Sequence, residues 1–108
     1  MQLSYNEKKI ELVNCKSFYS RLKGFMFDKN INKALLFDKC NSIHTFFMFC
    51  NIDVIMCDKK NIIIKYYNNL AKNKVILPKK AVTKVYEMPV NYFNNVKIGD
   101  KMEVIEWK

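Results

Sequence analysis

The hydrophobic and polar positions of this chain change over short distances, and the pattern predicts a protein built mainly from β-strands. Several runs are rich in β-branched and aromatic residues and are bounded by Asn, Asp, Gly or Pro, as is typical of strands. No run has the sustained 3.6-residue period of a long amphipathic helix. Strands are expected within residues 10–13, 34–38, 43–49, 52–58, 61–67, 81–90 and 98–107.

Two short helical segments interrupt these strands. Ser17 is a suitable N-cap for a helix that ends at Gly24, and a single helical turn is expected over residues 90–96. In the turn after residue 58, Asn61 is the residue best suited to a positive φ. Six to eight strands with two short helices predict a mostly β (α+β) fold, a small antiparallel β-barrel or sandwich.

Length and composition indicate one folded domain spanning residues 1–108. Half of the residues are hydrophobic, which excludes disorder, and no apolar run approaches the ~18 residues of a membrane span. The N-terminus lacks the basic start and apolar segment of a secretory signal, so we expect a cytoplasmic protein. In that reducing compartment the four cysteines are expected to be free thiols.

The formal net charge of +9 invites a nucleic-acid interpretation. Against it, Arg21 is the only arginine among 19 basic residues, and the lysines are scattered along the chain. The charge therefore predicts a solvated lysine-rich surface rather than a nucleic-acid partner. We expect instead a small-molecule or protein partner, no membrane association, and a monomer or weak dimer.

Candidate chemistry gathers in residues 40–58, which contain three of the four cysteines and the only histidine. Polar side chains inside apolar strands must find buried partners or face a cavity. A zinc site is not favoured, because the spacings between Cys40, His44, Cys50 and Cys57 match no common zinc motif. We therefore expect neither a metal nor a cofactor.

The default interpretation of this stretch is a ligand-binding or structural role, and in the structural form His44 and Asp53 fix an internal hydrogen-bond network. The functional interpretations are two. In one, His44 acts as a base oriented by Asp53, with Cys40 or Thr45 as the nucleophile. In the other, a groove beside His44 binds a ligand, and Arg21 clamps an anionic group. Strand alternation over residues 43–49 would place alternate side chains, including His44, on one face of that groove. The candidate ligand-binding residues are Arg21, His44, Thr45, Phe46, Met48 and Asp53.

Five segments resemble a known family in their order and spacing. They are RLKGFMF (21–27), ALLFDKC running into NSIHTFFM (34–48), IDVIMCD (52–58), VYEMPVNYF (85–93) and VKIGD (96–100). Over residues 10–105 the chain resembles the uncharacterised bacterial and archaeal family DUF192. This resemblance implies a small β-barrel-like fold with short helices, but no established activity. We expect a small-ligand-binding or interaction module with a groove beside His44, and the alternative is a hydrolase-like enzyme that uses the same residues.

Overall fold

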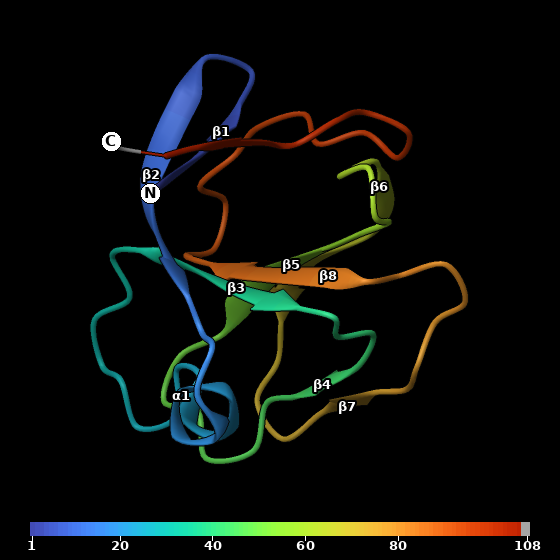
Figure 1. The fold of residues 1–108 in the computed structure, drawn as a ribbon. Coiled ribbons are helices and arrows are strands. Elements are labelled where there is room, and N and C mark those ends of the chain that lie inside the picture. The colour runs from blue at the N-terminus through green and yellow to red at the C-terminus, as the bar shows by residue number, and fades with distance from the viewer. Residues whose placement is uncertain (107–108) are drawn as a thin grey trace.

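The computed structural model describes residues 1–106, in which one large curled sheet and one small two-stranded ribbon form the fold (Figure 1). The large sheet has the strand order β6-β5-β8-β3-β2-β1-β9, and β4 pairs with β7 in the ribbon. All of these pairs are antiparallel except β2 and β3, so the sheet is mixed. The mostly β prediction is confirmed. The elements are β1 (Gln2–Tyr5), β2 (Lys8–Asn14), α1 (Phe18–Lys23), β3 (Ala34–Asp38), β4 (Ile43–His44), β5 (Ile52–Cys57), β6 (Ile63–Leu70), β7 (Val75–Ile76), β8 (Lys84–Met88) and β9 (Glu103–Ile105).

The central strands β3, β5 and β8 separate two hydrophobic cores. Leu36 and Tyr86 pair across β3 and β8 and belong to the first core, which the sheet encloses as it curls towards β1, β2 and β9 (Figure 1). Leu35 and Val85 point to the opposite face and belong to the second core, which α1 and the β4-β7 ribbon cover (Figure 1). Strands buried on both faces appear in sequence as continuous apolar runs, which explains the runs at β3 and β5.

The helix α1 forms as its end signals predict. The backbone N–H of Ser20 donates to the Ser17 hydroxyl at 3.0 Å, which is the expected N-cap, and the Gly24 N–H closes the last turn on the Ser20 carbonyl. Gly24 has φ +48, and a Cβ added there would lie 3.5 Å from Oε1 of Glu87. The end of α1 therefore packs directly on β8. Among residues 1–106, no helix has the length and apolar character needed to span a membrane.

The strand predicted over residues 43–49 forms only at Ile43–His44. The chain then turns, because the Thr45 hydroxyl donates to the Ala71 carbonyl at 2.8 Å and Phe47 takes a positive φ of 62°. The predicted single face of alternating side chains along this segment is therefore not formed. Strand β4 instead leaves the large sheet and pairs with β7.

The helical turn predicted over residues 90–96 is also absent, and the segment forms irregular turns. Asn91 and Asn95 have φ values of 60° and 56°, which a right-handed helix cannot accommodate. Asn61 does adopt the expected positive φ, 65°. In the last predicted strand, Trp107 lies outside the described residues.

The cysteines are free and differ in exposure. Cys15 and Cys57 are buried, whereas Cys40 and Cys50 are half-buried. Burial raises the pKa of Cys57 to about 12, so almost none of it is the reactive thiolate near neutral pH.

We expect iodoacetamide at pH 8 to alkylate Cys40 and Cys50 first, because their thiols are accessible. Cys57 should react on the order of a hundredfold more slowly until the protein is denatured, because it is buried and protonated. Peptide mass spectrometry of a labelling time course measures these rates. Equal rates at Cys40 and Cys57 would show that β5 opens during labelling.

Candidate functional site

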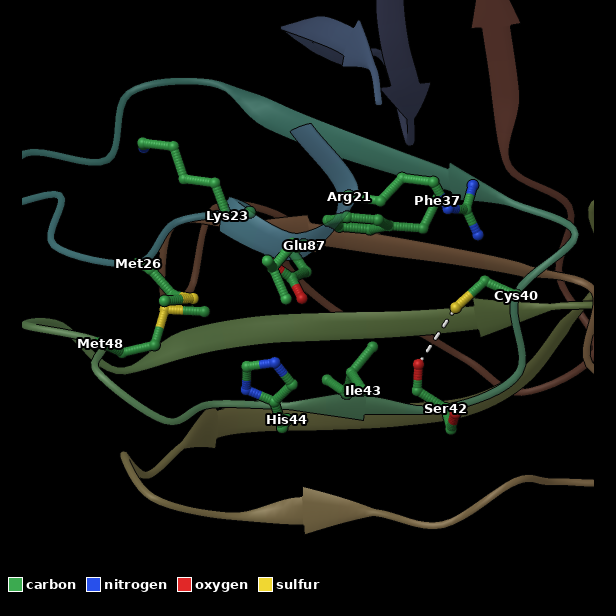
Figure 2. A pocket seen from close by; sticks show the side chains of 12 residues that line it. Arg21, Lys23, Met26, Phe37, Cys40, Ser42, Ile43, His44, Met48 and Glu87 are labelled. Atoms are coloured by element: carbon green, nitrogen blue, oxygen red, sulfur yellow. Dashed lines mark hydrogen bonds between the residues drawn. The ribbon is translucent and has the colours of Figure 1, made fainter. Parts of the chain in front are cut away.

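A cavity of about 120 Å³ lies between α1, the central sheet and β4 (Figure 2). The helix and the chain after it form one wall, β3 and β8 form the floor, and the segment leading into β4 forms the opposite wall. Its lining combines apolar side chains with a few polar ones. The residues are Arg21, Leu22, Lys23, Gly24, Met26, Phe37, Cys40, Ser42, Ile43, His44, Met48 and Glu87.

Glu87 is the most unusual residue of this cavity. It is 3% exposed, and its Oε1 has no hydrogen-bond partner among the described residues. Figure 2 shows its carboxyl in the middle of the cavity, pointing from the sheet towards the wall that carries Ile43 and His44. Burial raises the pKa of Glu87 to about 8, so the carboxyl is mostly protonated near neutral pH. A buried acid without a partner is the type of group found at functional sites.

Sequence reasoning missed Glu87. Glu87 lies between Tyr86 and Met88, whose side chains belong to the first core, so strand alternation alone places the acid on the other face of the sheet. The face of β8 that carries Glu87 is nevertheless buried, because α1 and the β4-β7 ribbon cover it. The available signal was its place in VYEMPVNYF, a segment shared with the family that the chain resembles.

Arg21 lies in the last turn of α1, at one end of the cavity. Its Nη1 donates to the backbone carbonyl of Asp38 at 2.8 Å, which fixes the guanidinium against the end of β3. Nε and Nη2 make no hydrogen bond with other described residues. Lys23, also in the lining, is paired with Asp28, whose Oδ1 lies 3.1 Å from Nζ. The free donors of Arg21 are therefore available to a bound group.

His44 and Cys40 lie on the wall opposite the helix. Nδ1 of His44 accepts from the backbone N–H of Phe46 at 3.2 Å, so the proton of the neutral ring is on Nε2. The ring is held further by stacking on Phe46, with centroids 5.4 Å apart. Cys40 Sγ donates to the Ser42 carbonyl at 3.1 Å. Among the described residues no hydrogen bond joins His44 to Cys40.

Met48 also lines the cavity, next to Met26, with which it forms an isolated β-bridge. The two methionines close the cavity at the end away from Arg21 (Figure 2). Of the six residues proposed from sequence, the structure brings Arg21, His44 and Met48 to one cavity, and Phe46 supports His44 from outside it.

Asp53 and Thr45 lie elsewhere. Asp53 is buried and accepts hydrogen bonds from the Tyr66 hydroxyl at 2.7 Å and the Asn69 N–H at 2.7 Å, with further donors from neighbouring asparagines. The Thr45 hydroxyl accepts from Lys74 N–H at 2.8 Å while donating to a backbone carbonyl. Both side chains are occupied in holding loops together. Neither is hydrogen-bonded to His44, so the geometry of the hydrolase alternative is not assembled among residues 1–106.

Four exposed phenylalanines lie within two residues in sequence of Met26, His44 or Met48, which line the cavity, and we name Phe27, Phe46, Phe47 and Phe49 the aromatic rim. Their side chains are between 41% and 63% exposed. The Phe27 ring lies 5.9 Å from that of Phe47 and 5.8 Å from that of Phe49. Phe27 and Phe47 both have positive φ, which is rare for bulky residues. A cluster of this kind is typical of an interaction surface.

Comparison with known proteins shows the family to which the chain belongs. Residues 1–104 match the family DUF192, which is described as "Uncharacterized ACR". The chain belongs to the DUF192 family. A UPF0127 protein of Pyrococcus abyssi is 36% identical over 107 residues, covering 92% of this chain and 88% of its own. A UPF0127 protein of Thermococcus kodakarensis is 33% identical over 97 residues, covering 84% of this chain and 60% of its own, so the match spans less than two thirds of that relative.

Solved structures share the DUF192 fold at low sequence identity. A protein of unknown function from Novosphingobium aromaticivorans has a TM-score of 0.80 and 13% identity, and the match covers 95% of this chain and 82% of that protein. A Sinorhizobium meliloti protein described as a candidate transcription regulator has a TM-score of 0.78 and 15% identity, covering 94% and 89%. At these identities the likeness concerns the fold alone. The function of this DUF192 chain must therefore be argued from its own cavity.

Proposed function

We propose that this protein is a ligand-binding module that holds a small polar group in the cavity beside His44. The observation that carries the proposal is the buried Oε1 of Glu87, which faces the cavity without a partner. Leaving a buried polar atom without a hydrogen bond costs about 1–3 kcal/mol, and a ligand that supplies the missing partner recovers that free energy. A cavity of about 120 Å³ suits a group of a few non-hydrogen atoms.

The surroundings of the cavity support the same proposal. Donors and acceptors reach it from separate elements, since Arg21 comes from α1, His44 from β4 and Glu87 from β8. A few polar groups among apolar walls are the usual design of a small-ligand site. The aromatic rim offers apolar contact to the part of the ligand that remains outside the cavity.

We expect His44→Ala to weaken ligand binding while changing the free energy of unfolding by less than about 1 kcal/mol. The imidazole is only half-buried, and the Phe46 N–H that it accepts from can bond to water instead. Binding is measured by amide NMR shifts on titration with millimolar propionate, propionamide or propylamine, and stability by urea denaturation.

Val75→Ala is the matched control. Val75 pairs with His44 across the ribbon, is 53% exposed and does not line the cavity, so its loss should leave probe binding intact. If His44→Ala lowered stability strongly and no probe shifted the amides of residues 21–26, 40–44 and 87 in the unmodified protein, His44 would be a structural residue and the proposal would fail.

A further inference from the structure

We infer that the cavity receives a carboxylate, to which Glu87 donates from the floor and Arg21 and His44 donate from the walls. This inference rests on the proposed ligand-binding function and names the chemical class of the bound group. Three observations carry it: the charges around the cavity, the direction of the available hydrogen bonds, and the burial of Glu87.

The charges favour an anion over a cation. Arg21 and Lys23 line the cavity, and among the described lining residues Glu87 is the only carboxyl. The chain as a whole carries a formal charge of +9. Because Lys23 is paired with Asp28, the uncompensated positive charge of the lining is that of Arg21. A ligand cation would be repelled by Arg21 and by the field of the whole protein, whereas an anion is attracted by both.

The available hydrogen bonds are mostly donors. One Nη1 bond holds the guanidinium of Arg21 on the Asp38 carbonyl, and its remaining N–H groups have no described partner. His44 presents its Nε2 proton because Nδ1 already accepts from the Phe46 N–H. A carboxylate is an acceptor only and offers about four lone-pair positions, which suits a cavity with donors on two of its walls.

Glu87 becomes a third donor when it carries its proton. Burial raises its pKa to about 8, so near neutral pH the hydroxyl of the acid can donate to an incoming carboxylate. Leu35 and Val54, which pair with Glu87 from β3 and β5, are apolar and cannot neutralise its ionised form. The titratable or charged groups that face it are Cys15 just after β2, Arg21 and Lys23 from α1, and Cys40 and His44 from the opposite wall.

Two carboxyl groups in contact share one proton more readily than they bear two negative charges. Binding a carboxylate therefore requires protonated Glu87, and the affinity must fall as the pH rises through about 8. A bound amine would show the opposite trend, because it requires ionised Glu87. The pH dependence consequently separates the two ligand classes.

The test compares propionate, propionamide and propylamine, which have similar size and differ in charge. Each is titrated into the full chain at pH 6.5, 7.5 and 9.5, and binding is followed by amide NMR shifts around the cavity. We expect propionate to bind at least about tenfold more tightly than propionamide. Its affinity should fall on the order of 20-fold between pH 7.5 and pH 9.5.

Variants at position 87 assign the effect to this residue. Glu87→Gln keeps a donor that does not titrate, so it should bind propionate at all three pH values with little change in affinity. Glu87→Ala removes the donor and should weaken propionate binding at pH 6.5. Arg21→Gln should weaken it at every pH without changing the pH dependence. Circular dichroism melts establish that each variant is folded.

Each outcome decides a separate question. Preferential binding of propylamine, growing with pH, would overturn the carboxylate inference and leave the ligand-binding proposal standing. Propionate affinity that falls equally steeply in Glu87→Gln would overturn the role of Glu87 as donor. If none of the three probes shifted the cavity amides at any pH, the inference and the proposed function would both be overturned.

Discussion

Replacing Glu87 by glutamine is expected to stabilise the protein by up to about 5 kcal/mol near pH 9 and to change little near pH 4.5. The reason is the buried carboxyl of Glu87, whose pKa is raised from 4.5 to about 8 by burial. Among the described residues, its Oε1 has no hydrogen-bond partner and no basic side chain forms an ion pair with it. The folded protein therefore resists ionisation of this side chain.

The sign of the effect follows from proton linkage. Below about pH 4.5 the carboxyl is protonated in the folded and unfolded states, and its contribution to stability is fully present. Between pH 4.5 and about 8 the unfolded chain releases the proton while the folded protein retains it, so this contribution is progressively lost. Above about 8 both states are ionised and no further change occurs. Glutamine does not titrate, so the Glu87→Gln variant does not lose this stability as the pH rises.

Urea denaturation at pH 4.5, 6.5 and 9 measures the difference in the free energy of unfolding between the Glu87→Gln variant and the unmodified protein. For a domain of this size, the expected difference at the highest pH corresponds to a rise in Tm on the order of 10 °C or more. Glu11→Gln is the matched control, because Glu11 is exposed on β2 and its replacement should change stability by less than about 0.5 kcal/mol at every pH. Parallel stability curves for the Glu87→Gln variant and the unmodified protein would show that Glu87 ionises normally.

A residue that lowers stability at neutral pH needs another reason to be present. A polar or ionisable group that reduces stability is typical of binding and catalytic sites, where ligand contacts offset the loss. For Glu87 the reason we propose is the group bound in the cavity. The stability test and the binding test therefore examine the same Glu87 carboxyl. The first measures what the carboxyl costs in stability, and the second measures what it contributes to ligand binding.

Local signals in the sequence were sufficient for much of the fold. The cap at Ser17, the end of α1 at Gly24 and the positive φ of Asn61 depend on neighbouring residues only, and all three were predicted. The hairpin between β1 and β2 was not predicted as such. Its turn residues Asn6 and Glu7 both have positive φ, and no glycine marks the position.

The site depended on long-range packing and was only partly predictable. His44 and Asp53 belong to segments adjacent in sequence, which suggested adjacent strands, but β4 pairs with β7 while β5 stays in the large sheet. Glu87 was missed because the cover over its face of β8 comes from α1 and the ribbon. Periodicity identifies the two faces of a strand, but it cannot show that both will be buried.

Asp53→Ala is expected to lower the free energy of unfolding by about 3–5 kcal/mol. The Asp53 carboxylate is buried and accepts from the Tyr66 hydroxyl at 2.7 Å, Asn68 Nδ2 at 3.0 Å, the Asn69 N–H at 2.7 Å and the Asn91 N–H at 3.0 Å. Alanine leaves these donors without their acceptor, and two of them are backbone groups that cannot turn away. Burial and the hydrogen bond to Asp53 raise the pKa of Tyr66 to about 12, so spectrophotometric titration should also show a lower tyrosine pKa in the variant.

Asp28→Ala is the control for Asp53→Ala, because it removes a carboxylate that is not buried. Asp28 pairs with Lys23 at 3.1 Å, and its side chain is 35% exposed, so its loss should cost less than about 1 kcal/mol. Urea denaturation of both variants at pH 7 gives the comparison. Asp53 joins β5 to the end of β6 and to the segment after β8, so its removal should also speed hydrogen exchange at Asn69 and Asn91. A loss of stability no greater than that of Asp28→Ala would show that water replaces the carboxylate, and that these segments hold together without it.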